Sequence, residues 1–300
     1  MELNINDHEL FKTFLNDTLF NNKFNKMKNE GSNSIVELIV RPECNQKCEY
    51  CYITKYGDEL YPKELRVDKK TIINNIKILL DYFYNNKCFV KSWELFAGDL
   101  FYDDLFFDLI DLFYDYYLKI QNNYNDIYRN LLDREETNDE SYVRNLSENI
   151  ISVPCNFSFC HDDKKIQKFK EVFHKMLEVN TYISLSYSTD GIYAIDHREK
   201  RSNVTQEFYK KVFSLCNECG YGCHPMISYE NIDSAIDNYE WWKKMYKEYL
   251  YNLPDFMPCM LEVRNEGWTP EAIDKYLKFL DYLINDRIKI YNNDLKLFVR

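Results

Sequence analysis

Glycine and proline are scarce in this sequence, with 7 of each among 300 residues. That scarcity excludes collagen-like chains and argues against a low-complexity disordered protein. A basic excess is missing too, because 38 lysine and arginine residues face 49 aspartate and glutamate residues, for a net charge of -11. Proteins that bind nucleic acid or anionic membranes broadly carry the opposite balance. We therefore expect no nucleic acid and no membrane among the partners.

Long apolar runs are also absent. No stretch reaches the roughly 18 apolar residues of a membrane span, and the N-terminal sequence MELNINDHELFK has early acids and no basic-then-apolar signal. We expect a soluble, cytoplasmic chain. In that reducing setting, the 10 cysteines indicate metal, cluster or redox chemistry before disulfides.

What the sequence does contain is an alternation of short apolar, β-branched runs with longer amphipathic patterns. The predicted strands are 35–41, 91–97, 150–158, 182–188, 223–229 and 257–264. The predicted helices are 68–84, 101–120, 163–178, 204–219, 231–251 and 269–286, the last with Thr269 as its N-cap. Six such repeats predict an α/β fold with a parallel sheet, either open or curled into a barrel.

The predicted organisation has one core. Residues 1–34 are polar and form a leader segment, and 35–286 form the α/β core. The connection 122–148 is longer and more polar than the others, so we expect an insertion or a long loop there. Residues 287–300 are predicted to form a C-terminal tail.

Three cysteines, Cys44, Cys48 and Cys51, lie within eight residues directly after the first predicted strand. The loops that follow parallel strands lie at the end of the sheet that usually carries the chemistry. A structural zinc site would require a fourth ligand. Three thiolates on one loop suit a four-iron four-sulfur cluster with one iron left open. A zinc half-site, or three unrelated cysteines, is the alternative.

The spacing Cys44-x3-Cys48-x2-Cys51, with Tyr50 before the last cysteine, resembles the signature of the radical S-adenosylmethionine superfamily. The form CNQKCEYCY is especially similar to the branch whose members often carry a SPASM or twitch extension. The resemblance spans most of 35–286 and implies a partial (β/α)6 TIM-like barrel. It also implies that the three cysteines hold the cluster, that the open iron binds S-adenosylmethionine, and that Tyr50 lies near the adenine.

The stretch ELFAGDLF ends the second predicted strand. Gly98 and Asp99 stand where the resemblance implies a Gly-Gly-Glu-Pro-like turn that contacts the amino group of the cofactor. An acid after a turn glycine can accept a charge-assisted hydrogen bond. Ala97 and the missing proline depart from the family pattern.

The fourth predicted strand ends in SYSTDG, similar to a Ser-x-Asp-Gly stretch of the same branch. The resemblance implies that Ser188 and Asp190 lie near the cofactor. It further implies a basic residue, either Arg198 or Arg201, that holds the cofactor carboxylate. An Asp-Gly turn followed by solvated charges is the alternative.

Two other cysteine groups are open to interpretation. Cys216, Cys219 and Cys223 lie where the fourth predicted helix gives way to a strand, and either bind metal or pack the helix end. Cys155 and Cys160 flank the end of the third predicted strand, where they either reach the mouth of the site or belong to the core.

The resemblance implies reductive cleavage of S-adenosylmethionine to a 5'-deoxyadenosyl radical, which abstracts hydrogen from a substrate. By branch, that substrate is a peptide or protein side chain, and the reductant is a flavodoxin or ferredoxin. No catalytic residue is assigned. The 287–300 tail has no cysteine for a SPASM extension, so the chain is either a minimal member or part of a longer polypeptide. The rival hypotheses are a non-catalytic iron–sulfur or zinc protein, and a degenerate barrel that binds a partner.

Overall fold

A computed structural model gives the structure of the chain. It describes residues 35–48, 51–87, 90–132, 149–188, 191–192, 205–219, 222–224, 226–229, 231–249, 262–263 and 267–298. The chain divides into two compact units, Met1–Ser186 and Tyr187–Arg300, which are described separately below. The predicted leader 1–34 lies outside the described residues. No helix in the described ranges is long and apolar enough to cross a membrane.

The first unit is built on a parallel sheet. Its strands lie in the order β1 (Ile35–Arg41), β2 (Ser92–Ala97), β3 (Asn149–Cys155) and β4 (Thr181–Ser188), the last ending just past the unit. The register sets Ile35 beside Ser92, and Ser92 beside Ile150. The parallel α/β prediction is confirmed, and three of these strands both begin and end within one residue of their predicted bounds. The third ends earlier than predicted, because the chain turns after Cys155 into a short 3-10 helix, Ser158–His161.

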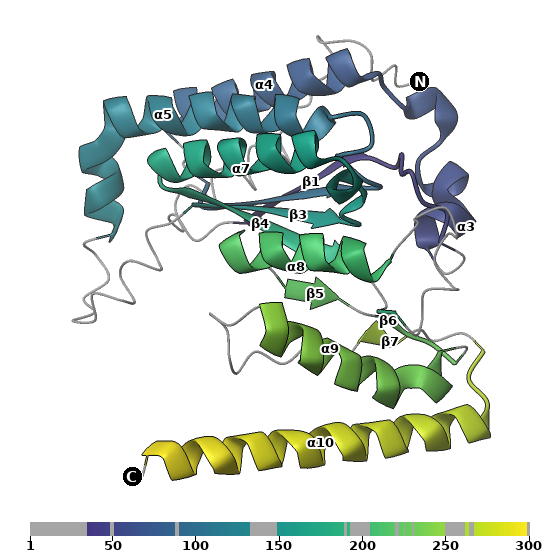
Figure 1. The fold of residues 1–300 in the computed structure, drawn as a ribbon. Coiled ribbons are helices and arrows are strands. Elements are labelled where there is room, and N and C mark those ends of the chain that lie inside the picture. Colours follow the sequence, from purple (N-terminus) through teal and green to yellow (C-terminus); the bar gives the residue numbers. More distant parts are fainter. Residues whose placement is uncertain are drawn as a thin grey trace. The chain divides into compact units, whose positions relative to one another are not determined.

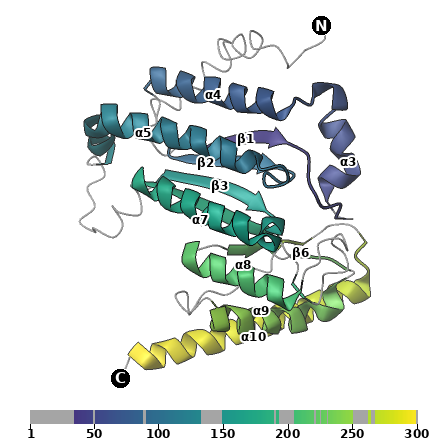
Figure 2. The ribbon, with the colours of Figure 1, turned by 45° about the horizontal axis from the view of Figure 1, so that its top comes forward.

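Three helices cover one face of this sheet: α4 (Lys69–Asn85), α5 (Leu105–Leu132) and α7 (Asp163–Glu178) (Figure 1). They lie side by side in the order α4, α5, α7, as a second view confirms (Figure 2). In β3 and β4 alternate residues are buried, which is the period-2 pattern of a strand in a sheet. Trp93 is fully buried at the centre, with its ring 5.3 Å from those of Phe83 and Phe113.

The helix starts follow from local side chains. Asp68 caps α4 by accepting the Thr71 N–H at 2.7 Å, and Asp162 caps α7 by accepting the Lys164 N–H at 2.9 Å. Two helical segments were not predicted. The short α3 (Tyr52–Leu60) follows the cysteines directly, and α5 continues to Leu132, into the segment predicted as an insertion or loop.

The second unit holds α8 (Gln206–Cys219), β5 (Gly222–His224), α9 (Ala235–Tyr249) and α10 (Pro270–Phe298). It also holds a parallel pair, β6 (Met226–Ile227) and β7 (Glu262–Val263). The predicted strand 223–229 is thus divided in two. Helix α10 runs through most of the 287–300 segment predicted as a tail. It packs on α9, where Asp286 accepts a hydrogen bond from the Tyr239 hydroxyl at 3.0 Å.

Candidate functional site

The cysteine loop leads from β1 into α3. The Cys51 N–H donates to the Cys48 carbonyl at 3.0 Å, and the Gln46 N–H donates to the Cys44 sulfur at 3.3 Å. Cys48 is buried and the other two cysteines are half-buried. All three are free thiols, so no disulfide competes for them. Tyr50, predicted beside the adenine, lies outside the described residues.

The turn after β2 lies against this loop. The Gly98 N–H donates to the Arg41 carbonyl at 2.9 Å, and the Asp99 N–H donates to the Glu43 carbonyl at 2.8 Å. A side chain at Gly98 would overlap the carbonyl oxygens of Pro42 and Glu43, so only glycine permits this approach. Two stretches singled out in the sequence, far apart along the chain, are therefore in direct contact.

The Asp99 carboxyl group is fully buried. Its Oδ1 accepts the Phe101 N–H at 2.8 Å, whereas Oδ2 has no hydrogen-bond partner among the described residues. Burial raises the pKa of Asp99 to about 6, partly offset by the Phe101 amide, the charge of Arg41 and the nearby polar side chains of Asn156 and Ser158. A buried acceptor left unpaired is costly, and a cationic ligand would relieve that cost.

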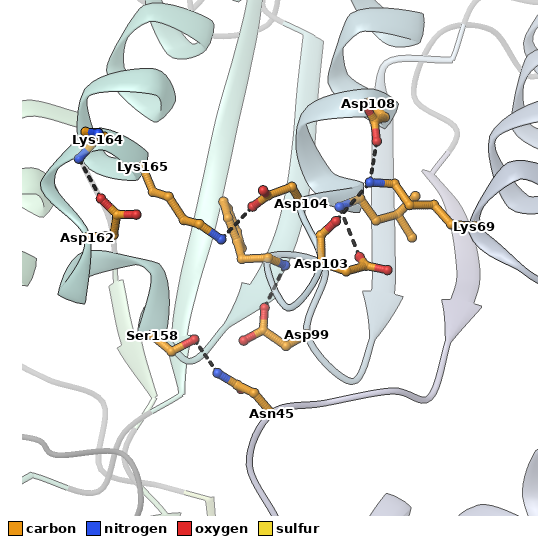
Figure 3. A network of polar contacts seen from close by, with 12 residues as sticks. Asn45, Lys69, Asp99, Asp103, Asp104, Asp108, Ser158, Asp162, Lys164 and Lys165 are labelled. Atoms are coloured by element: carbon orange, nitrogen blue, oxygen red, sulfur yellow. Dashed lines mark hydrogen bonds and ion pairs between the residues drawn. The ribbon is translucent and has the colours of Figure 1, made fainter.

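A third segment, the turn after β3, joins the loop through amide side chains. The Asn156 Nδ2 donates to Asn45 Oδ1 at 2.7 Å and makes a longer contact, 3.8 Å, with the Cys44 sulfur. Asn45 in turn donates to the Ser158 hydroxyl at 2.6 Å (Figure 3). These residues were not predicted, although the polar Asn-Phe-Ser run directly after an apolar strand was a signal that could have found them.

Charged side chains hold the segment beyond Asp99. Arg41 binds Asp103 through both guanidinium nitrogens at 2.7 Å, a bidentate pair at the end of β1. Lys69 donates to the Asp103 carbonyl at 2.9 Å, and Lys165 pairs with Asp104 at 2.7 Å (Figure 3). Helices α4 and α7 are thereby both tied to the turn that presents Asp99.

Burial raises the pKa of the Cys44 thiol to about 12, against the smaller lowering effect of the Gln46 amide; the negative charge of Asp99 adds to the rise. The free thiol is therefore protonated at neutral pH, and a metal would have to displace that proton. Within the described ranges, no three Cys, His, Asp or Glu side chains converge closely enough to hold a metal ion. The Cys48 thiol instead points to the Gln46 side chain, 3.6 Å from Oε1.

The other residues singled out in the sequence lie in the second unit, outside the described residues, or beside the turn after β3. Ser188 ends β4 and belongs to the second unit. Asp190, Arg198 and Arg201 lie outside the described residues. Cys216 and Cys219 are buried on α8, and Cys155 and Cys160 are buried beside the turn after β3. Burial, together with the negative charge of Asp99, raises the pKa of Cys155 well above its usual range, and Cys44 contributes to the same rise.

Comparison with protein-family models and with curated protein sequences finds no match to this chain.

Proposed function

We propose that this protein is a radical S-adenosylmethionine enzyme, with Cys44, Cys48 and Cys51 as ligands of a four-iron four-sulfur cluster. The observation that carries the proposal is the direct contact between the cysteine loop and the Gly98–Asp99 turn. The cysteine loop and the Gly98–Asp99 turn each resemble a cofactor-binding stretch of that family. A shared cofactor site would require these two stretches to be in contact.

The donor set is compatible with the cluster. Three thiols without disulfides lie on one loop at the end of a parallel strand, where soft ligands for iron are expected. The unpaired Oδ2 of Asp99 is a buried acceptor suited to the cationic amino group of S-adenosylmethionine. A cluster held by the three cysteines would supply one electron for reductive cleavage of S-adenosylmethionine, the chemistry by which a 5'-deoxyadenosyl radical would be made available for hydrogen abstraction from a substrate.

The chain's own residues supply positioning. The Asp99 carboxylate would accept a hydrogen bond from the cofactor amino group. The Asp99 backbone N–H keeps the turn fixed by donating to the Glu43 carbonyl. Asn156 places an N–H near the Cys44 sulfur, and such contacts adjust the reduction potential of thiolate-bound clusters. We further propose that the sheet belongs to a partial (β/α)6 barrel. The cofactor site would be completed by Ser188, Asp190 and either Arg198 or Arg201. The substrate would be a peptide or protein side chain, and the reductant a flavodoxin or ferredoxin.

The test is product formation by the full chain. The protein is reconstituted anaerobically with iron and sulfide, reduced with dithionite and given S-adenosylmethionine. We expect release of 5'-deoxyadenosine, and none from the Cys48→Ala variant. A loaded, reduced protein that releases none would refute catalysis and leave a structural iron–sulfur protein or a barrel that only binds a partner. Zinc in place of iron after purification and reconstitution would support the zinc alternative.

A further inference from the structure

A groove of about 510 Å³ runs along the edge of β1 in the first unit. Seven successive residues, Glu37 to Glu43, line one side of it. The opposite side includes the apolar side chains of α4, namely Ile72, Ile76 and Leu79. Successive strand residues point to opposite faces of a sheet. An unbroken run of lining residues therefore means that the groove follows the edge of the strand rather than one face.

Among the residues that the structure describes, no backbone group of another strand pairs with that edge. In the part of the chain that the structure describes, β1 pairs with β2 alone, so its other edge has no strand beside it. An uncovered edge is a ready template for one more strand. At the usual rise, a seven-residue strand presents roughly 20 Å of edge, enough for an extended segment of similar length.

Three polar side chains of the groove, Glu37, Glu43 and Asn75, offer acceptor oxygens. The buried Oδ1 of Asn75 has no hydrogen-bond partner, and no ion pair to Glu37 or Glu43 occurs within the described ranges. Glu37 also lies beside Glu94 in the sheet register, so two like charges are neighbours on one face.

Two cations, Arg41 and Arg66, also line the groove. Carboxylates outside the groove already hold both of them, since Arg41 binds Asp103 and Arg66 is held by groups of α3. Arg66 donates to the Tyr61 carbonyl at 2.9 Å and pairs with Asp58 at 2.7 Å. It therefore stabilises the end of α3 instead of neutralising the groove. A complementary ligand must donate hydrogen bonds and bring positive charge, besides apolar groups for the α4 side.

We propose that the groove binds an extended polypeptide segment that pairs with the free edge of β1 and carries a lysine or arginine side chain. Strand addition of this kind takes its affinity from backbone hydrogen bonds and its specificity from alternate side chains. The basic side chain would meet Glu37, Glu43 or Asn75, and apolar side chains would pack on Ile72, Ile76 and Leu79 of α4.

The groove leads to the candidate site. Glu43, the last residue of the lining run from β1, directly precedes Cys44. Its carbonyl oxygen accepts the hydrogen bond from the Asp99 N–H. A segment bound along β1 would thus end beside the cysteine loop. The identification of that segment as the flank of a peptide substrate rests on the proposed function, whereas its binding does not.

Binding is tested on the full chain by fluorescence anisotropy, without iron. The probe is a fluorescein-labelled nonapeptide of alternating valine and threonine with one central lysine. Two further forms carry N-methyl groups on one or the other alternate set of amides. We expect saturable binding of the unmodified probe and of one methylated form. The other form should bind at least about tenfold more weakly, because a single peptide edge pairs with β1.

Protein variants test the charge requirement. Glu37→Gln combined with Asn75→Leu should weaken the lysine probe about threefold or more and leave a norleucine probe unchanged. Glu178→Gln, at an exposed position at the end of α7, is the matched control and should change neither. Circular dichroism of each variant verifies the fold.

No saturable binding up to about 1 mM probe, a free energy of about -4 kcal/mol, would overturn the proposal. So would equal binding of the two methylated forms, or a dimer seen by light scattering that the probe does not dissociate. These outcomes are independent of 5'-deoxyadenosine release, so binding without catalysis would refute only the proposed function. Catalysis without binding would refute only the groove assignment.

Discussion

The backbone N–H of Asp99 donates a hydrogen bond to the carbonyl oxygen of Glu43 at 2.8 Å. This bond joins the turn after β2 to the residue that precedes the first cysteine. Neither partner depends on its side chain for this contact, so the approach of the turn to the loop is set by the backbone and by the absence of a side chain at Gly98.

Gly98→Ala should destabilise the protein. The added methyl group would overlap the carbonyl oxygens of Pro42 and Glu43, and the loop would have to shift. We expect a loss of about 1–3 kcal/mol in the free energy of unfolding, measured by urea titration. Gly57→Ala is the matched control, because its methyl group would meet Ile53 at an ordinary 3.4 Å inside α3. That variant should be neutral or up to about 1 kcal/mol more stable. Equal effects of the two substitutions would contradict the close approach at Gly98.

Asp99→Ala should weaken binding of S-adenosylmethionine to the reconstituted protein about tenfold or more, because a charge-assisted hydrogen bond is lost. Equilibrium dialysis measures the affinity. Asp104→Asn is the control and should leave the affinity unchanged. Asp104 lies five residues after Asp99, and its carboxylate pairs with Lys165 of α7. An unchanged affinity in Asp99→Ala would show that this carboxylate does not contact the cofactor.

Cys48→Ala should abolish the broad absorbance at about 400 nm that thiolate-ligated clusters give after anaerobic reconstitution. Cys216→Ala removes a buried thiol from α8 in the second unit and should keep that absorbance. The iron content of both variants is measured in parallel. A full complement of iron in Cys48→Ala would remove this residue from the ligand set.

Asn156→Leu should loosen the cysteine loop. The substitution removes the 2.7 Å hydrogen bond to Asn45 and the N–H near the Cys44 sulfur. Amide hydrogen exchange in the metal-free protein should accelerate about fivefold or more across the loop, which corresponds to the loss of one hydrogen bond of ordinary strength. Asn86→Ala, at the end of α4, serves as the control and should leave exchange in the loop unchanged.

Alkaline pH should destabilise the second unit. Burial, together with the hydrogen bond to Asp286, raises the pKa of Tyr239 in the folded chain. The unfolded chain loses this proton at about pH 10. The folded state therefore binds more protons above that pH, and its stability falls as the pH rises. The free energy of unfolding, measured by circular dichroism of the helices, should fall less between about pH 10 and 11 in Tyr239→Phe than in the unmodified protein. An identical pH dependence in both proteins would contradict the assigned pKa shift.

Local patterns predicted much of the fold. The β-branched run at Ile35–Arg41 was assigned as a strand with its observed bounds, and the acidic caps at Asp68 and Asp162 agree with the predicted helix starts. The Gly98–Asp99 turn and the cysteine loop meet because both follow parallel strands that are neighbours in the sheet.

Other features could not be obtained from local patterns. Asn156 and Asn45 are 111 positions apart, and nothing near either residue identifies the other as its partner. Helix α3 is too short to show a sustained period, and the start of the polar segment 122–148 gave no sign that α5 would continue through it. Strand 223–229 reads as one apolar run, but its backbone is divided between β5 and β6.

The division of the chain into two units has a consequence for the order of synthesis. Every described residue that supports the cysteine loop, from Arg41 to Ser158, lies in the unit that ends at Ser186. At about 5–20 residues per second, the ribosome needs several seconds or more to add the second unit after the first. We therefore expect the three thiols and Asp99 to be in place on the nascent chain before translation ends, so that iron can be loaded while the protein is still being made.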